Sequence, residues 1–312
     1  MTDSVVRIGF FGTPDAAATC LRALAADERF DVALVVTNPD RLAGRGRVPT
    51  PPPVREVADE VGLAVIQPDR AAHAIDPVAE AGLDVAAVVA YGSILPPELL
   101  AATRHGFVNL HFSLLPRWRG AAPVQHAIRA GDPSTGVTAF LLDEGMDTGP
   151  ILRTVTTDIG PRETAGELLT RLTELGIPVL ADALLALVGG EEPTPQPAEG
   201  ATLAPKVAPA DVAIDWRWPA VEVDRLCRSA DPRPGAHTTL RSRRLKVFGA
   251  RPVDAMGAPG TVLAIDEGPV VACGEGAVLL DDVQPDGRAR MTGRDLLNGQ
   301  QVRLGELLGH DD

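Results

Sequence analysis

Short apolar runs alternate with helix-like stretches along about the first 185 residues, and no other feature constrains the fold as strongly. The runs predicted as strands are residues 5–11, 32–37, 85–90, 106–111, 137–142 and 149–156. The stretches between and after them, among them residues 164–187, are predicted helices. This alternation is typical of an α/β domain whose mostly parallel sheet is covered on both faces. Ligands of such sheets bind beyond the carboxyl ends of the strands.

A glycine- and proline-rich segment, residues 189–209, ends this pattern and is expected to be extended and semi-rigid. Beyond it, one predicted helix at 220–229 precedes short predicted strands at 237–240, 244–253, 260–266, 270–273 and 277–283. A chain of 312 residues also favours two domains. We therefore predict a first domain at 1–188, a linker at 189–209 and a smaller C-terminal β-barrel of the OB type at 210–312.

The formal net charge of -13 argues against a generally basic protein that coats nucleic acid. A local positive surface is still enough for one RNA ligand. Residues 201–312 hold 14 Lys/Arg against 16 Asp/Glu, whereas residues 1–200 hold 15 against 26, so the C-terminal third is closer to neutral. Three dispersed cysteines favour reduced thiols over disulfides or zinc. The sequence has no signal-like start and no long apolar segment, so we expect a cytoplasmic protein without a membrane partner. We also expect a monomer that binds no metal.

An amide, an imidazole and a carboxylate stand at the ends of predicted segments in the middle of the chain: Asn109, His111 and Asp147. Asn109 and His111 alternate along one predicted strand, so both side chains point to the same face. The amide can donate a hydrogen bond to a developing oxyanion, and the imidazole can donate when protonated or suitably tautomerised. Asp147 can orient the imidazole and raise its pKa, or relay a proton. Taken singly, each residue is as well explained as a cap, a buried polar group or a turn former.

The motifs around these residues narrow the interpretation. Asn109-x-His111 is followed by Ser-Leu-Leu-Pro at 113–116, by Arg-Trp-Arg-Gly at 117–120, and later by Asp-Glu-Gly-Met-Asp-Thr-Gly at 143–149. Together they resemble the 10-formyltetrahydrofolate-dependent formyltransferase family, and the resemblance spans nearly the whole chain. It implies a Rossmann-like formyltransferase domain in which Asn109, His111 and Asp147 are catalytic and pass a one-carbon unit to an amine without a metal.

The resemblance also implies a folate pocket. In the family, the tetrapeptide at 113–116 lines this pocket through main-chain groups, and the loop after the strand at 85–90 surrounds the pterin ring. A glycine in that loop permits close approach of the backbone to a ligand. The residues expected to bind 10-formyltetrahydrofolate are Tyr91, Gly92, Ile94, Leu95, Ser113, Leu114, Leu115, Pro116 and Asp143.

Two basic segments are candidates for contact with tRNA. The first, residues 37–47, carries three arginines and two glycines, and it resembles the inserted loop with which tRNA-specific members of the family approach the acceptor end. The second is a cluster on a predicted C-terminal strand or hairpin, which is also explained as a solvated edge. The residues expected to contact initiator methionyl-tRNA are Arg41, Arg45, Arg47, Lys206, Arg241, Arg243, Arg244 and Lys246.

The resemblance thus implies formyl transfer to the α-amine of methionyl-initiator tRNA. The α-amine is substantially neutral near pH 7, so direct attack needs no covalent formyl-enzyme. A formyltransferase acting on glycinamide ribonucleotide or on an amino sugar would use the same three residues, but it has no obvious need for the 37–47 segment or a C-terminal barrel. A non-catalytic tRNA- or folate-binding module is the other alternative, and it has no reason to keep all three residues together.

Overall fold

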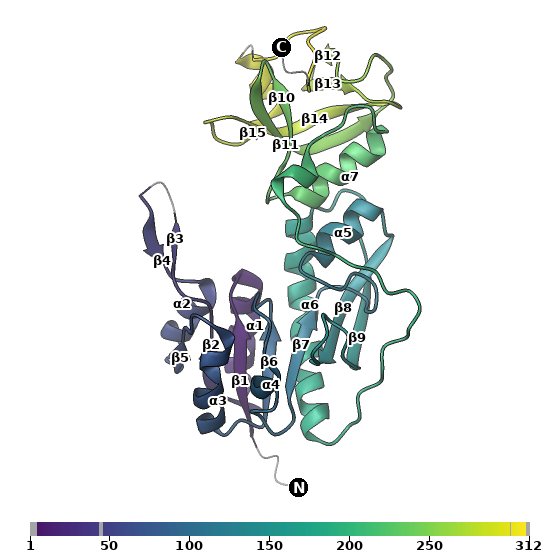
Figure 1. Ribbon diagram of the computed structural model, residues 1–312. Helices are drawn as coiled ribbons and strands as arrows, with labels where there is room; N and C mark the ends of the chain where they lie inside the picture. The colour runs from purple at the N-terminus through teal and green to yellow at the C-terminus, as the bar shows by residue number, and fades with distance from the viewer. Residues whose placement is uncertain (1–4, 44–45, 300, 310–312) are drawn as a thin grey trace. The chain divides into compact units, whose positions relative to one another are not determined.

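The computed structural model describes residues 5–43, 46–299 and 301–309 (Figure 1). Grouped by their contacts, they form two compact units. The first comprises residues up to 123 together with 134–158 and 169–205, and the second comprises 124–133, 159–168 and the residues from 206 onward. The two short segments that group with the C-terminal residues depart from the sequence-based boundaries, which placed them in the first domain.

A seven-stranded sheet forms the first unit, with strand order β5-β2-β1-β6-β7-β8-β9. Its four pairings from β5 to β7 are parallel, whereas β8 and β9 are antiparallel to their neighbours. The strands are β1 (Val6–Gly12), β2 (Phe30–Val36), β5 (Val65–Ile66), β6 (Val85–Val89), β7 (Phe107–His111), β8 (Ser134–Leu141) and β9 (Ile151–Asp158). The prediction of a mostly parallel sheet is confirmed.

The helices between and after these strands are α1 (Asp15–Ala25), α2 (Pro53–Glu60), α3 (Ile75–Ala81), α4 (Pro97–Leu100), α5 (Pro123–Ala130) and α6 (Ala165–Val188). A 3-10 turn, Ala71–Ala74, precedes α3. All five residues of β6 are buried, as expected for a central strand covered on both faces. The core is mainly aliphatic, with a few aromatic contacts such as Phe11 on Phe107, whose ring centroids are 5.2 Å apart.

An antiparallel sheet forms most of the second unit, with strand order β10-β11-β14-β13-β12 and β15 paired to β14. Its strands are β10 (Ala236–Leu240), β11 (Arg243–Val253), β12 (Val262–Ile265), β13 (Pro269–Ala272), β14 (Ala277–Pro285) and β15 (Met291–Thr292). Helices α7 (Ala220–Ala230) and α8 (Gly293–Asn298) and a 3-10 turn, Pro209–Val212, also belong to this unit, and most of α5 and the start of α6 group with it. The antiparallel character is confirmed, and the OB-like barrel stays a prediction.

The three cysteines are free and buried. Burial raises the pKa of Cys20 to about 12 and that of Cys273 to about 11, so both are thiols rather than thiolates near neutral pH. None of the helices in the described ranges is long and apolar enough to cross a membrane.

Candidate active site

Asn109 and His111 lie on β7 and point to the face of the sheet opposite α6. The residue between them, Leu110, packs so closely on α6 that a Cβ added at Gly176 would be 2.7 Å from its Cδ2. Because side chains alternate along a strand, Asn109 and His111 project the other way. Among the described residues, the Asn109 amide has no hydrogen-bond partner, and the residue is half-buried. An amide held on a rigid strand without a partner is available to a ligand.

The imidazole of His111 is buried and fixed by a main-chain oxygen. Its Nε2 lies 2.8 Å from the carbonyl oxygen of Trp118. A carbonyl oxygen only accepts hydrogen bonds, so Nε2 carries the proton and Nδ1 is the acceptor in the neutral ring. The residue is only 5% exposed, and its ring meets Phe140 edge-on with centroids 6.4 Å apart. These contacts fix both the tautomer and the plane of the imidazole.

Asp147 faces the other ring nitrogen. Its Oδ2 lies 3.7 Å from His111 Nδ1 and accepts a hydrogen bond of 2.7 Å from the main-chain N–H of Gly120. Asp147 has a φ of 53°, in the left-handed region that aspartate tolerates better than most residues. The sequence-based expectation that Asp147 lies beside His111 is met.

The pKa of His111 is lowered from its ordinary value, chiefly by burial. The negative charge of Asp147 and the hydrogen bond to the Trp118 carbonyl both act to raise it, but burial outweighs them. The expectation that Asp147 raises the pKa of the imidazole is confirmed for that interaction, and burial makes the net shift a lowering. His111 is neutral near pH 7.

The loop that carries Asp147 starts at the end of the sheet opposite the loops that follow β6 and β7. The sequence did not predict this starting point. Since β8 runs antiparallel to β7, its carboxyl end lies beside the beginning of β7, where Leu142 N–H donates to the Phe107 carbonyl at 2.8 Å. The loop then returns to bring Asp147 to His111. Asp143 shapes this return, because its Oδ1 accepts from Gly145 N–H at 3.0 Å and from the Thr148 hydroxyl at 2.7 Å.

All of the predicted folate residues except Asp143, which follows β8, come after the adjacent parallel strands β6 and β7, whose loops lie at the same edge of the sheet. Gly92 has a φ of 81°, and the Ile94 side chain is 91% exposed, which is unusual for a large apolar group. The Tyr91 ring, by contrast, is 2% exposed and packs edge-on against Phe11, so that side chain belongs to the core. Leu95 is buried as well.

Two residues missed by sequence reasoning hold the Tyr91 loop. The Tyr91 carbonyl accepts from the Asn38 amide at 2.8 Å and from the Thr13 hydroxyl at 3.1 Å, and Asn38 also donates to Thr13. They tie together the segments after β1, β2 and β6. Asn38 precedes Pro39 and Thr13 precedes Pro14, so in the sequence both look like ordinary turn residues.

The tetrapeptide at 113–116 is a turn that is hydrogen-bonded to β8 through Thr138. The hydroxyl of Ser113 donates to the Arg117 carbonyl at 2.6 Å, and its own carbonyl accepts from the Thr138 hydroxyl at 2.7 Å. Ser113, Leu115 and Pro116 are buried and Leu114 is half-buried. These internal bonds fix the main chain of the turn, the part that is expected to meet the folate.

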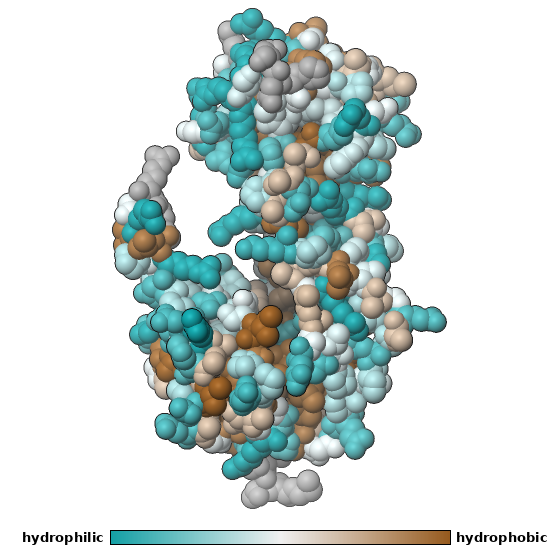
Figure 2. Space-filling model, in the orientation of Figure 1, coloured by the Kyte–Doolittle hydropathy of each residue, from teal (hydrophilic) through white to brown (hydrophobic). Residues whose placement is uncertain are grey.

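The first basic segment contains one short strand and leads into a second. Strands β3 (Arg41–Ala43) and β4 (Val48–Thr50) pair with each other and form a separate two-stranded sheet. Arg41 and Arg47 are exposed, as are Leu42 (56%) and Val48 (62%). Figure 2 shows hydrophilic and hydrophobic side chains together on this arm. Arg45 lies outside the described residues.

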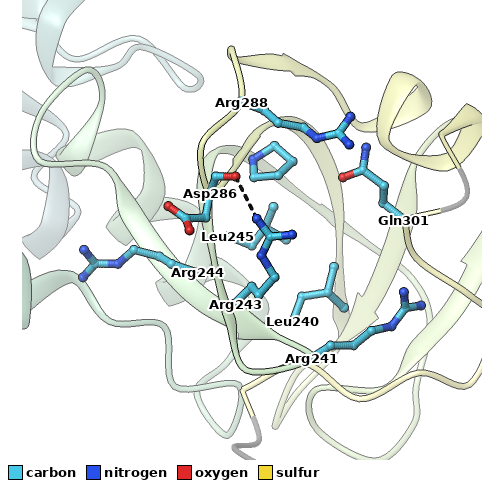
Figure 3. Close-up of a pocket in the computed structure, with 9 residues that line it drawn as sticks. Leu240, Arg241, Arg243, Arg244, Leu245, Asp286, Arg288 and Gln301 are labelled. Atoms are coloured by element: carbon cyan, nitrogen blue, oxygen red, sulfur yellow. Dashed lines mark hydrogen bonds between the residues drawn. The ribbon is translucent and has the colours of Figure 1, made fainter. Parts of the chain in front are cut away.

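The second basic cluster surrounds a depression of about 210 Å³ in the C-terminal unit (Figure 3). It is lined by Leu240, Arg241, Arg243, Arg244, Leu245, Pro285, Asp286, Arg288 and Gln301. Arg288 was missed because it follows an ordinary Pro-Asp-Gly turn in the sequence. Partial burial and then the charges of Arg244 and Lys246 lower the pKa of His237, which is a sign of local positive potential.

The predicted basic residues differ in what already contacts them. Arg241 forms an ion pair with Glu306, with its Nη2 3.0 Å from Oε2, and Lys246 donates to the Pro234 carbonyl at 2.8 Å. Arg243 makes one long bond of 3.3 Å to the Asp286 carbonyl, drawn in Figure 3. Lys206 is exposed. A search of the described ranges for groups of three or more His, Cys, Asp or Glu that could hold a metal ion found none.

Comparison with known proteins identifies the family to which this fold and this site belong. Residues 6–184 match the formyl transferase family, and residues 206–301 match the formyl transferase C-terminal domain. The chain therefore belongs to the formyl transferase family.

Within the family, the similarity is to one kind of enzyme. The chain is 46% identical to a methionyl-tRNA formyltransferase of Frankia alni, over 97% of this chain and 94% of that protein. It is 45% identical to the one of Streptomyces coelicolor, over 97% and 100%.

Solved structures share the fold at lower identity. HypX from Aquifex aeolicus in complex with tetrahydrofolic acid has a TM-score of 0.66 at 19% identity, over 97% of this chain and 49% of that one. Phosphoribosylglycinamide formyltransferase from Bacillus halodurans has a TM-score of 0.51 at 26% identity, over 60% of this chain and 97% of that one.

Proposed function

We propose that this protein transfers the formyl group of 10-formyltetrahydrofolate to the α-amine of methionyl-initiator tRNA, which gives formylmethionyl-tRNA for translation initiation. The observation that carries the proposal is the identity of about 45% to methionyl-tRNA formyltransferases along nearly the full length of both chains. The geometry of Asn109, His111 and Asp147 supplies the chemistry that such a reaction needs.

In this proposal, His111 is the base and Asn109 is the oxyanion donor. The neutral imidazole holds its proton on Nε2 against the Trp118 carbonyl, so Nδ1 has the lone pair that accepts the amine proton. The resulting imidazolium donates through Nδ1 toward Asp147, whose carboxylate stabilises the positive charge. The Asn109 amide, which has no partner among the described residues, donates to the formyl oxygen as negative charge develops there. The formyl C–N10 bond then breaks, and the proton taken up by His111 would pass to N10, so that tetrahydrofolate leaves.

The residues present fit a folate. The exposed Ile94 beside Gly92 offers an apolar contact and a close approach to the backbone, and the turn at 113–116 offers fixed main-chain groups. The folate would be held by Gly92, Ile94, Leu95, the Tyr91 main chain, Ser113–Pro116 and Asp143. When bound, it supplies the activated formyl group, and the side chains of the chain itself position the acceptor and move the proton.

Contact with tRNA is assigned to exposed arginines on both units: Arg41 and Arg47 on the β3–β4 hairpin, and Arg243, Arg244 and Arg288 around the depression. Arg45 and Lys206 remain in the proposed set from the sequence. Arg241 is a weaker candidate because its charge is paired with the Glu306 carboxylate, and Lys246 is weaker because it is half-buried with its ammonium bonded to the Pro234 carbonyl. We further propose domains at 1–188 and 210–312 with a linker at 189–209, a monomer, and a cytoplasmic site of action.

The test is a formylation assay with four acceptors in parallel: charged initiator Met-tRNA, charged elongator Met-tRNA, glycinamide ribonucleotide and an amino-sugar nucleotide. Selective formylation of the initiator supports the proposal. Transfer to a small amine alone would keep the chemistry and overturn the acceptor. Absence of transfer to all four would leave a binding protein and overturn the proposal.

A further inference from the structure

The segment at 194–204, expected from the sequence to be a plain linker, is bound to the candidate active site. At one end, Thr194 pairs with Ile151 at the start of β9 through two hydrogen bonds of 2.7 and 2.8 Å. At the other end, the segment runs beside Arg119, which donates through its N–H to the Thr202 carbonyl at 2.8 Å and accepts from Ala204 N–H at 2.7 Å. The segment therefore spans the site from β9 to the residues that follow β7.

Gln196, in the middle of this segment, uses its whole amide to join two parts of the site. Its Oε1 accepts from Arg119 Nη2 at 2.6 Å and from Arg119 Nε at 3.1 Å. Its Nε2 donates to the Asp147 carbonyl at 2.9 Å and to the Gly149 carbonyl at 2.8 Å. With two bonds accepted and two donated, the amide is fully satisfied.

Both anchors of Asp147 depend on this segment. The main chain of Asp147 is in the left-handed region, φ 53°, and its carbonyl is held by Gln196. Its side chain is held by Gly120 N–H, and Gly120 itself lies against residue 204: a Cβ there would be 2.7 Å from the Ala204 oxygen. A backbone conformation that an aspartate rarely adopts persists only when its surroundings fix it.

We propose that Gln196 is a positioning residue of the reaction, which acts through Asp147 to set the carboxylate opposite His111 Nδ1. This inference rests on the proposed function, because it concerns the same reaction. Loss of the Gln196 amide frees the Asp147 main chain, and the 3.7 Å separation between Oδ2 and Nδ1 is then no longer fixed. Displacement of a catalytic group by about 1 Å lowers a rate by on the order of 100-fold.

The first experiment compares Gln196→Leu, which keeps the size of the side chain and removes its polar atoms, with Glu199→Leu, an exposed position in the same segment. We expect kcat to fall about 10- to 100-fold in Gln196→Leu, with KM for both substrates within about threefold, and no change in Glu199→Leu. An unchanged kcat in Gln196→Leu would overturn the inference.

A double-mutant cycle separates positioning from a merely structural role. In an Asp147→Ala background the carboxylate that Gln196 positions is gone, so Gln196→Leu should lower kcat by less than about twofold. If Gln196→Leu lowered kcat by the same factor in the Asp147→Ala background as in the wild-type background, Gln196 would act independently of Asp147, and the inference would fail.

A third readout does not depend on turnover. The Cε1–H resonance of His111, assigned by its absence in His111→Asn, reports the imidazole pKa directly. Asp147 raises that pKa, so misplacing the carboxylate should lower it in Gln196→Leu and leave it unchanged in Glu199→Leu. An identical titration in Gln196→Leu and wild type would contradict the inference, even for a protein that formylates nothing. Wild-type protein inactive on every acceptor would contradict only the proposed function.

Discussion

His111 and Asp147 are held by the same three-residue segment rather than by each other. The Trp118 carbonyl fixes His111 Nε2 at 2.8 Å, and the Gly120 N–H fixes Asp147 Oδ2 at 2.7 Å. Between the two side chains, Nδ1 and Oδ2 are 3.7 Å apart, longer than a hydrogen bond. The imidazole and the carboxylate are thus set opposite each other, ready for a proton to arrive on Nδ1.

Removing the oxyanion donor should cost more in rate than in binding. Asn109→Ala is expected to lower kcat about 100- to 1000-fold, because a single oxyanion donor typically contributes that much. KM for the tRNA should change little, since the amide acts on charge that develops during the reaction. The measurement is steady-state formylation of initiator Met-tRNA.

His111→Ala and Asp147→Ala serve as companions in the same assay, since each removes one partner of the proton transfer. Full activity in all three single variants would refute the assignment of roles. A raised KM with unchanged kcat in Asn109→Ala would instead make the amide a binding group.

The pH dependence of kcat should follow the lowered pKa of His111. A base must be neutral to accept a proton, so activity should fall on the acid side only, as the pH drops through a value below the ordinary 6.5 of histidine. In Asp147→Asn, the interaction that raises the pKa is lost, so the acid limb should move to still lower pH while the plateau falls.

The matching measurement is a kcat profile from pH 5 to 8 at saturating substrates, with a check that the protein stays folded at pH 5. A limb that moves to higher pH in Asp147→Asn would contradict the electrostatic assignment. An acid limb at or above the ordinary histidine value of 6.5 in wild type would contradict the lowered pKa of His111.

Sequence periodicity located the parallel strands well, because a buried central strand such as β6 is a continuous apolar run. It also placed Asn109 and His111 on one face, since a strand alternates strictly. It did not show that β8 reverses direction, because strand direction depends on the connections and not on the pattern within a strand. Nor did it show the docked segment at 194–204, whose bonds run mostly through main-chain groups that every sequence has.

The net pKa shift of His111 was also beyond sequence reasoning. The residue types predicted the attraction between His111 and Asp147, which raises the pKa. The opposing desolvation depends on how completely Phe140 and the surrounding turn exclude water, and only the folded structure gives that burial.

Arginines around the C-terminal depression should differ in their contribution to tRNA binding. Arg243→Ala and Arg288→Ala are expected to weaken affinity and to reduce the slope of log K against log salt by about 0.7–0.9 each, as expected for one lost phosphate contact. Arg241→Ala should have less effect, because Glu306 already neutralises that charge. Filter binding at several salt concentrations measures both quantities.

The control for these arginines is Arg217→Ala, an exposed arginine of the same unit that is paired with Asp215. Equal losses for Arg217 and Arg288 would indicate a general charge effect and not a binding site at the depression. Loss of affinity without a change in salt slope would argue against phosphate contacts.

Breaking a buried ion pair should strongly destabilise the C-terminal unit. Asp224 accepts from Arg162 Nη1 at 2.6 Å and from Arg228 Nε at 2.8 Å, and Asp224 and Arg228 are 5% and 8% exposed. Asp224→Ala leaves the buried Arg228 charge without its carboxylate, so we expect about 3–5 kcal/mol of destabilisation. The control, Asp215→Ala, removes a surface pair with Arg217, and such pairs contribute at most about 1 kcal/mol. Urea unfolding followed by tryptophan fluorescence compares the two variants, and equal midpoints for Asp224→Ala and wild type would show that the pair contributes nothing.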